Sequence, residues 1–272
     1  MFCKKQNGQI LLIVMLVVIV ASTIGLSLAS RSITSLRTST EEAESQKALA
    51  AAEAGIERAL QGSVPIATSS NSSSNTPGYT TQVDQVFGNN FLINGGNIIT
   101  KDEGADLWLA TYNSDPNLNY GAPWTGDLSI YWGDSSGDCK NAALEIIIVS
   151  GSKDDPTSER YVFDSCDQRI LQNGFASPQS TTPENIVSNG ITKTFPYGVT
   201  VSVSDGLIAR VIPIYGNAYA GVIGNGDSPL PFQGYVITSI GKSGQANRKI
   251  TVFKGYPQTY LPYLSYGLFV AN

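Results

Sequence analysis

The chain has 272 residues, of which 42% are hydrophobic and 14% charged, and its formal net charge is −5. An acidic chain lacks the basic surface that nucleic-acid phosphates require, so no nucleic-acid partner is expected. The sequence contains no histidine, which removes the commonest general base and the commonest metal ligand. We therefore expect no enzyme activity, no cofactor and no metal.

The N-terminus combines a short basic segment with a long apolar one. Lys4 and Lys5 are the only charged residues before Arg31. The uncharged stretch 9–30 is about 20 residues long, enough to cross ~30 Å of hydrocarbon as a helix. By the positive-inside rule the basic end stays in the cytoplasm, which places the rest of the chain outside. We expect one transmembrane helix over 9–30.

A helical pattern continues from residue 31 to residue 61 as an amphipathic segment. Its apolar positions recur at spacings of three, four or seven, namely Ile33, Leu36, Ala43, Ala50, Ile56 and Leu60. One helix over 9–61 would be roughly 80 Å long. Its second half would bury this apolar stripe against a folded domain. Gly62 and Pro65 end the helix, and the Ser/Asn-rich segment 62–78 is expected to be a linker.

Strand signals dominate the remaining segment, 79–272. Runs of β-branched and aromatic residues between Gly, Asn, Asp and Pro predict strands at 79–87, 106–112, 127–132, 142–150, 159–165, 197–204, 207–215, 233–240 and 247–254. Asp205-Gly206 predicts a hairpin between two of these strands, and the Gly241–Gly244 segment predicts another. The expected fold class is α+β, with a long N-terminal helix followed by a mainly antiparallel β domain.

Cys139 and Cys166 flank a predicted hairpin formed by strands 142–150 and 159–165. The two cysteines would meet near the open end of this hairpin, and thiols outside the cell pair. A bridge there closes a loop of about 28 residues and would contribute roughly 3–4 kcal/mol in the chain-entropy description. Two free thiols are the alternative. Cys3 lies on the cytoplasmic side of the apolar segment.

Three other patterns have functional and structural interpretations. Acidic residues at Asp134, Asp138 and 154–155 could supply oxygen ligands to calcium, but neither cluster matches the twelve-residue calcium loop, and both are typical of turns. Gly241-Lys242-Ser243 lacks the first glycine of a phosphate-binding loop and is interpreted as a turn. The aromatic residues Tyr256, Tyr260, Tyr263, Tyr266 and Phe269 form either a closing segment on the sheet or a contact surface for a partner or a sugar.

The N-terminal region resembles the type IV pilin superfamily. The resemblance rests on the basic leader, on Gly8 directly before the apolar helix, and on the amphipathic continuation. Within that continuation, the segment 48–57 (ALAAAEAGIE) is similar to the helix end of PilX-like minor pilins. The resemblance covers residues 1–61 and implies that a prepilin peptidase cuts between Gly8 and Gln9 and then methylates Gln9.

Two positions depart from the pattern of major pilins, which carry phenylalanine first and glutamate fifth after the cut. Here these positions hold Gln9 and Ile13. In the family the glutamate is thought to pair with the N-terminal amine of a neighbouring subunit, because a carboxylate in an apolar environment is costly unless it is paired. K-type tip pseudopilins and some PilX-like minor pilins also lack this glutamate. The resemblance to them implies low copy number and a tip or initiating position.

The resemblance implies a structural function, as a minor pilin or pseudopilin that joins, primes or caps a type IV pilus-like filament. The implied partners are other pilin subunits through the N-terminal helix, the prepilin peptidase and the assembly platform. The chain would be a single-pass protein of the cytoplasmic membrane with an extracytoplasmic domain, and extracellular after assembly. The alternatives are a membrane-anchored adhesin or binding module that does not polymerise, and a conventional signal peptide cleaved before Ser30.

Overall fold

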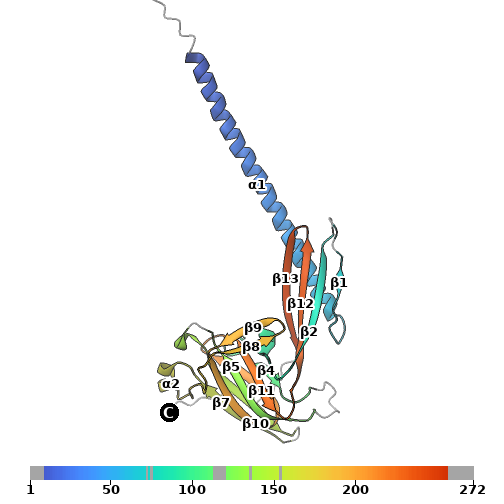
Figure 1. Ribbon diagram of the computed structural model, residues 1–272, viewed down its shortest axis with the longest axis vertical. Coiled ribbons are helices and arrows are strands. Elements are labelled where there is room, and N and C mark those ends of the chain that lie inside the picture. The colour runs from blue at the N-terminus through green and yellow to red at the C-terminus, as the bar shows by residue number, and fades with distance from the viewer. Residues whose placement is uncertain are drawn as a thin grey trace, which may run out of the picture. The chain divides into compact units, whose positions relative to one another are not determined.

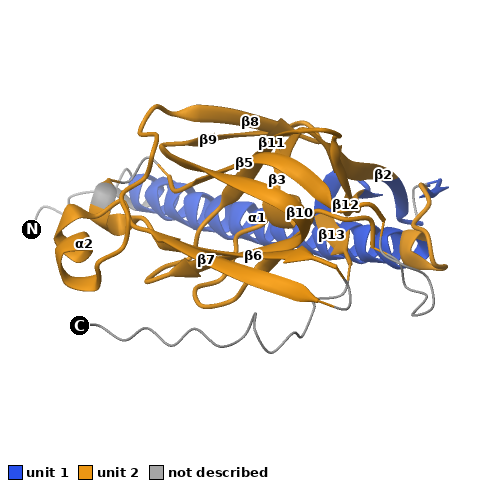
Figure 2. Cartoon of the chain, turned by 90° about the horizontal axis from the view of Figure 1, so that it is seen from below, with its two compact units in different colours: residues 1–58, 68–81, 239–250 blue, residues 59–67, 82–238, 251–272 orange. Residues whose placement is uncertain are grey.

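The computed structural model describes residues 9–71, 73, 76–112, 121–134, 137–152 and 155–256. A long N-terminal helix precedes mainly antiparallel strands, which confirms the predicted α+β class (Figure 1). The chain divides into two compact units (Figure 2): unit 1 comprises residues 1–58, 68–81 and 239–250, and unit 2 comprises 59–67, 82–238 and 251–272. The segment predicted as one domain, 79–272, therefore contributes to both units.

Helix α1 runs without interruption from Gln9 to Leu60. Its 52 residues span about 78 Å at 1.5 Å per residue. The helix ends one residue before the predicted boundary, and Gly62 follows with a φ of 114°, a backbone conformation that favours glycine. Pro65, a few residues later, is buried.

A four-stranded sheet has the order β1-β2-β12-β13. Its strands are β1 (Ser69–Ser70), β2 (Gly78–Gly88), β12 (Leu230–Ser243) and β13 (Ala246–Gly255). Strand β1 lies inside the Ser/Asn-rich segment 62–78 that is predicted to be a linker. The hydroxyl of Thr81 explains the pairing, because it accepts the N–H of Thr68 at 2.7 Å and donates to the Thr68 carbonyl at 2.8 Å. The predicted hairpin near Gly244 is present, since only Gly244 and Gln245 separate β12 from β13.

A larger sheet lies within unit 2, in the order β3-β11-β5-β10-β6-β7, with β4 also paired to β10. Its strands are β3 (Asn90–Leu92), β4 (Ala105–Trp108), β5 (Trp124–Trp132), β6 (Ala143–Gly151), β7 (Pro156–Phe163), β10 (Tyr197–Ile214) and β11 (Ala220–Gly226). The remaining elements are η1 (Ile93–Gly96), η2 (Asp138–Lys140), helix α2 (Asp167–Asn173) and the two-stranded sheet of β8 (Glu184–Ser188) and β9 (Ile191–Phe195). Each residue pairing recorded for the larger sheet is antiparallel.

The predicted hairpin at Asp205-Gly206 is wrong, because both of its strands belong to the continuous strand β10. The register shifts between Val203 and Gly206 against β5, and between Gly206 and Ile208 against β6. Asp205 has a φ of 52°, so this dipeptide forms an irregularity within a strand. The two halves of β10 do not fold back on each other because the first pairs with β5 and the second with β4 and β6.

Strand β6 contributes to the core of unit 2 from both of its faces. Leu144, Ile146 and Ile148 join the larger hydrophobic cluster. Ile147 and Val149, which point to the opposite face, join a second cluster with Trp108 and Ile208. A strand buried on both faces reads as a continuous apolar run, which is why this strand could be predicted from sequence.

Candidate functional site along the N-terminal helix

The first part of α1 exposes apolar side chains on every side. From Leu11 to Val20 each side chain is large and apolar, with exposed fractions between 48% at Val20 and 75% at Leu11. Successive residues of a helix point about 100° apart, so no face of this stretch is covered. The helix is long and apolar enough to cross a membrane. Such a surface is stable in lipid or against other apolar helices, and not in water.

The predicted cleavage site lies at the start of this helix. Gly8 is outside the described residues, and Gln9 is the first residue of α1. Ile13, at the position where major pilins carry glutamate, is 61% exposed. The hydroxyls of Ser22 and Thr23 donate to the carbonyls of Val18 and Val20, each at 2.8 Å. These polar groups are satisfied within the helix, as an apolar environment requires.

The buried face in the second part of α1 differs from the predicted stripe. Ile33 and Leu36 are 59% and 67% exposed, and Ala43 and Ala50 are also exposed, whereas Ile56 is buried. The buried positions are dominated by small residues: Ala48, Ala51, Ala52, Gly55, Ile56 and Ala59. The prediction followed the spacing of apolar residues, but the face that packs is the one that allows the closest approach.

We call the contact between Ala48, Ala52 and Gly55 of α1 and Ser239 and Gly241 of β12 the helix seam; all five residues belong to unit 1. A methyl group added at Gly241 would overlap the carbonyl oxygen of Ala48 and lie 2.5 Å from the Ala52 nitrogen. The backbone of β12 therefore lies directly against the backbone of α1. Gly241 is inside the strand rather than in a turn, which corrects the sequence interpretation.

Gly55 makes an equally close approach from the helix side. A methyl group there would lie 2.8 Å from Tyr79 Cδ2, 3.0 Å from Thr81 Cγ2 and closer still to Ser239 Oγ. The hydroxyl of Ser239 is fully buried and has no hydrogen-bond partner among the described residues. Shape complementarity, rather than hydrogen bonding, therefore holds the centre of the helix seam.

Polar contacts lie beyond one end of the helix seam. The Glu44 carboxylate accepts hydrogen bonds from the Ser243 hydroxyl and from Lys47 Nζ, the latter at 3.0 Å. The Ser243 hydroxyl, followed by Lys47, lowers the pKa of Glu44 below its ordinary value. Arg248 Nε donates to Ser45 Oγ at 2.7 Å. These contacts fasten the β12–β13 turn to α1.

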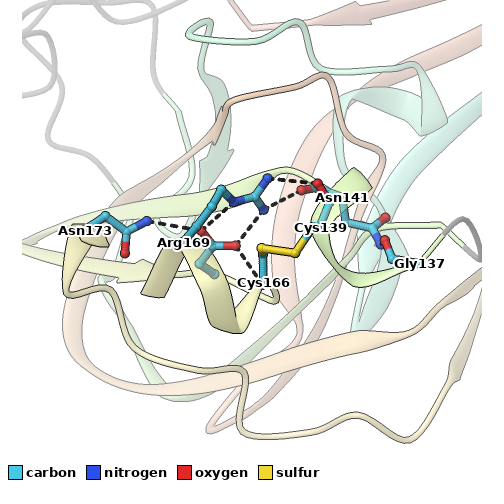
Figure 3. Close-up of a disulfide and its surroundings, with 7 residues drawn as sticks. Gly137, Cys139, Asn141, Cys166, Arg169 and Asn173 are labelled. Carbon is cyan, nitrogen blue, oxygen red and sulfur yellow. Dashed lines mark hydrogen bonds and ion pairs between the residues drawn. A yellow bond between two sulfur atoms is a disulfide. The ribbon is translucent and has the colours of Figure 1, made fainter. Parts of the chain in front are cut away.

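In unit 2, Cys139 and Cys166 form a disulfide with a Cα–Cα distance of 4.5 Å (Figure 3). Leu144 of β6 pairs with Phe163 of β7. The cysteines thus lie just outside the open end of this hairpin, where the sequence places them.

A buried ion pair reinforces the disulfide. Asp164 is 0% exposed, and its carboxylate accepts Arg169 Nε at 2.9 Å and Arg169 Nη2 at 2.6 Å. Arg169 also donates to the carbonyls of Cys139 and Asn141 (Figure 3). The hydrogen bond to Asp164 raises the pKa of Arg169. We call Cys139, Cys166, Asp164 and Arg169 the disulfide clasp.

Sequence reasoning missed the ionic part of the disulfide clasp. The available signal is an aspartate two residues before Cys166 and an arginine three residues after it. Nothing in that spacing shows that the arginine reaches back to the chain around Cys139, because this depends on the short helix α2.

The remaining candidate residues lie partly outside the described part of the chain. Among the described residues, no group of three or more His, Cys, Asp or Glu side chains could hold a metal ion. The backbone N–H of Asp134 donates to Asn141 Oδ1 at 2.8 Å, whereas Lys153 and Asp154 lie outside the described residues. Of the C-terminal aromatic residues Tyr256 is described, and Tyr260, Tyr263, Tyr266 and Phe269 are not.

Comparisons with protein-family models, with curated proteins and with solved structures found no match. Function is therefore inferred from the residues and their geometry.

Proposed function

We propose that this protein is a minor pilin or pseudopilin that joins, primes or caps a type IV pilus-like filament. The observation that supports this most is the continuity of α1. One helix is apolar on every side from Leu11 to Val20 and packs against folded strands between Ala48 and Gly55. A membrane anchor needs only the first property, whereas a subunit that builds a helical filament core needs both.

The same helix surface serves before and after assembly. A lipid bilayer and a core of packed helices both exclude water, so an all-apolar surface is stable in each. The partners in this proposal are other pilin subunits along α1, the prepilin peptidase at Gly8 and the assembly platform in the membrane.

The maturation step gives the first test. N-terminal sequencing and intact-mass measurement of the exported protein should find Gln9 as the first residue, methylated or cyclised. Gly8→Arg should leave the leader attached, whereas Gly25→Ala, within α1, should be processed normally. A mature N-terminus at Ser30 would contradict the proposal and indicate a conventional signal peptide.

A membrane-anchored adhesin that does not polymerise is the second candidate, because one exposed apolar helix is sufficient for an anchor. Shear fractionation separates the two functions. A filament subunit is released from cells in sedimentable filaments, and an anchored module stays with the membrane fraction.

Ile13 bears on the position within the filament. A shaft repeats each contact many times, so N-terminal amines without a carboxylate partner would accumulate unfavourable free energy in a dry core. A single tip subunit leaves only one N-terminal amine without a carboxylate partner, so we propose a tip or initiating position. Quantitative mass spectrometry of sheared filaments should find few copies per filament, and dominance of this chain would contradict the proposal. Ile13→Glu should not increase its incorporation.

A further inference from the structure

Unit 2 contains a pocket of about 350 Å³. Its walls come from η1, β4 and the segment between them, from Gln233 of β12, and from the end of β13 with the residue that follows it. The lining includes Asn94, Thr100, Glu103, Trp108, Phe253 and Tyr256. The volume is at the small end of the range of about 300–1,000 Å³ for ligand pockets. The lining combines aromatic rings with groups that can form hydrogen bonds.

Trp108 contributes a hydrogen-bond donor to the lining of the pocket. The other two indole N–H groups donate to carbonyls, Trp124 to Ser228 at 2.8 Å and Trp132 to Ala142 at 3.0 Å. Trp108 is only 6% exposed, yet its indole N–H has no acceptor in the part of the chain that the structure describes. Ser239 Oγ is the one buried side-chain nitrogen or oxygen atom without a partner among the described residues, so the Trp108 N–H keeps access to solvent and is available to a ligand. A ligand in this pocket could supply the missing acceptor.

The position of Trp108 is fixed by its neighbours. The Gln233 side chain accepts the Trp108 backbone N–H and donates to the Trp108 carbonyl, both at 2.8 Å. The Trp108 ring packs edge-on against Tyr112 and Tyr256, with centroid distances of 4.8 and 5.7 Å. A wall held this firmly loses little conformational freedom when a ligand binds.

Glu103 contributes a hydrogen-bond acceptor at the pocket. Its carboxylate is exposed and has no ion-pair partner among the described residues, whereas the adjacent Asp102 pairs with Lys101 at 3.5 Å. Asp106, which also lines the pocket, is held by Arg210 at 2.5 and 2.8 Å. The pocket therefore offers the ligand an acceptor at Glu103 and a donor at Trp108.

These groups define the class of the ligand. It must accept a hydrogen bond from an indole N–H, donate one to a carboxylate, and present an apolar surface to aromatic rings. A lysine-like ammonium group donates only, and a phosphate or carboxylate accepts only and is repelled by Glu103. Hydroxyl groups both donate and accept, and a sugar ring places them around an apolar face. We propose that this pocket binds a saccharide.

The saccharide site is independent of the filament proposal. An anchored module could carry it as well as a filament subunit could, so failure of one proposal leaves the other standing. At a filament tip, the site would make the subunit adhesive.

The test uses the full-length chain in a detergent that carries no sugar headgroup. The methyl glycosides of glucose, galactose, mannose and N-acetylglucosamine are titrated, with saturation-transfer NMR on the sugar and tryptophan fluorescence on the protein. At least one glycoside should bind and change the emission. The change should come from Trp108, because Trp124 and Trp132 are 2% and 0% exposed and do not line the pocket.

Substitutions then locate the binding. Trp108→Phe keeps an aromatic ring but removes the donor, so affinity should fall about tenfold. Glu103→Gln, at an exposed position that does not threaten folding, should also weaken binding about tenfold. Asp102→Asn is the matched control on the adjacent residue and should leave affinity unchanged. The proposal is overturned if no glycoside binds, if Glu103→Gln binds as well as the parent chain, or if Nα-acetyl-lysine methyl ester binds in preference to every sugar.

Discussion

The helix seam in unit 1 and the disulfide clasp in unit 2 each join segments that are distant in sequence, by different chemistry. The helix seam brings Gly241 against Ala48 and Ala52 with almost no polar contact at its centre. The disulfide clasp uses a covalent bond together with a fully buried carboxylate and the arginine that neutralises it.

The difference determines which substitutions each region tolerates. In the helix seam, glycine and alanine allow the two backbones to touch. Added atoms are destabilising there, because the backbones must separate to make room for them. A buried ion pair is sensitive to removed atoms, because the remaining charge is left without a partner. Substitutions that add or remove atoms should therefore have opposite consequences in the two regions.

The largest effect is expected for Arg169→Ala in the disulfide clasp. This change leaves the Asp164 carboxylate buried without its cation, so the free energy of unfolding should fall by about 3–5 kcal/mol. Denaturant unfolding under non-reducing conditions measures it. Arg248→Ala is the matched control, because it removes a hydrogen bond between exposed side chains and should change the free energy of unfolding by less than about 1 kcal/mol. Equal losses in the two variants would show that the ion pair does not stabilise the clasp.

A smaller loss is expected for Gly241→Ala in the helix seam. The added methyl group overlaps the Ala48 carbonyl, so unfolding should become easier by about 1–3 kcal/mol, the usual range for overpacking. Hydrogen exchange of the amides between 44 and 56 should also become faster. Gly25→Ala is the control, because it adds the same methyl group to α1 at a position where nothing lies within 4 Å. A loss of stability in that control would mean that the effect is not specific to the seam.

These contrasts also explain how much could be predicted from the sequence. Helix α1 and most strands follow from periodicity and hydropathy, which are local properties. The face of α1 that packs could not be identified from large apolar side chains. Ala48 and Gly55 lie on this face because their small size lets the strands approach the helix backbone. The Asp205-Gly206 signal failed for a related reason. A hairpin forms only where the flanking strands pair with each other, and here β5 and β6 are their partners.

The candidate sites divide in the same way. The Cys139–Cys166 pair could be predicted because two strands of similar length bring the flanking residues together. The contribution of Arg169 could not, since it depends on how α2 is placed after β7. The pocket at Trp108 is lined by residues far apart in sequence; Trp108 and Gln233 are separated by 125 positions. No local sequence pattern identifies such a pocket.

A gain of stability is expected for Ser239→Ala. The Ser239 hydroxyl is buried without a partner, so its removal should stabilise the protein by about 1 kcal/mol. Ser243→Ala is the matched comparison on the same strand, because it removes a hydrogen bond to Glu44 and should destabilise the protein. Thermal unfolding of the two variants should shift in opposite directions. If Ser239→Ala also lowers the melting temperature, its hydroxyl has a favourable contact.

The smallest effect is a pH dependence at the end of the helix seam. The pKa of Glu44 is lowered in the folded protein, first by the Ser243 hydroxyl and then by Lys47. A lowered carboxyl pKa stabilises the fold above the pKa of the unfolded chain, about 4.3, and this stabilisation is lost as the pH falls through the folded value. Arg169 has the opposite shift, so its guanidinium stays charged throughout this range. Acid should therefore loosen the β12–β13 turn. Hydrogen exchange at Gly244, corrected for the intrinsic pH dependence of exchange, should increase below about pH 4.3. Glu44→Gln should remove that increase, because the titrating group is gone while an acceptor oxygen remains. The same increase in both proteins would assign the acid sensitivity to another carboxyl group.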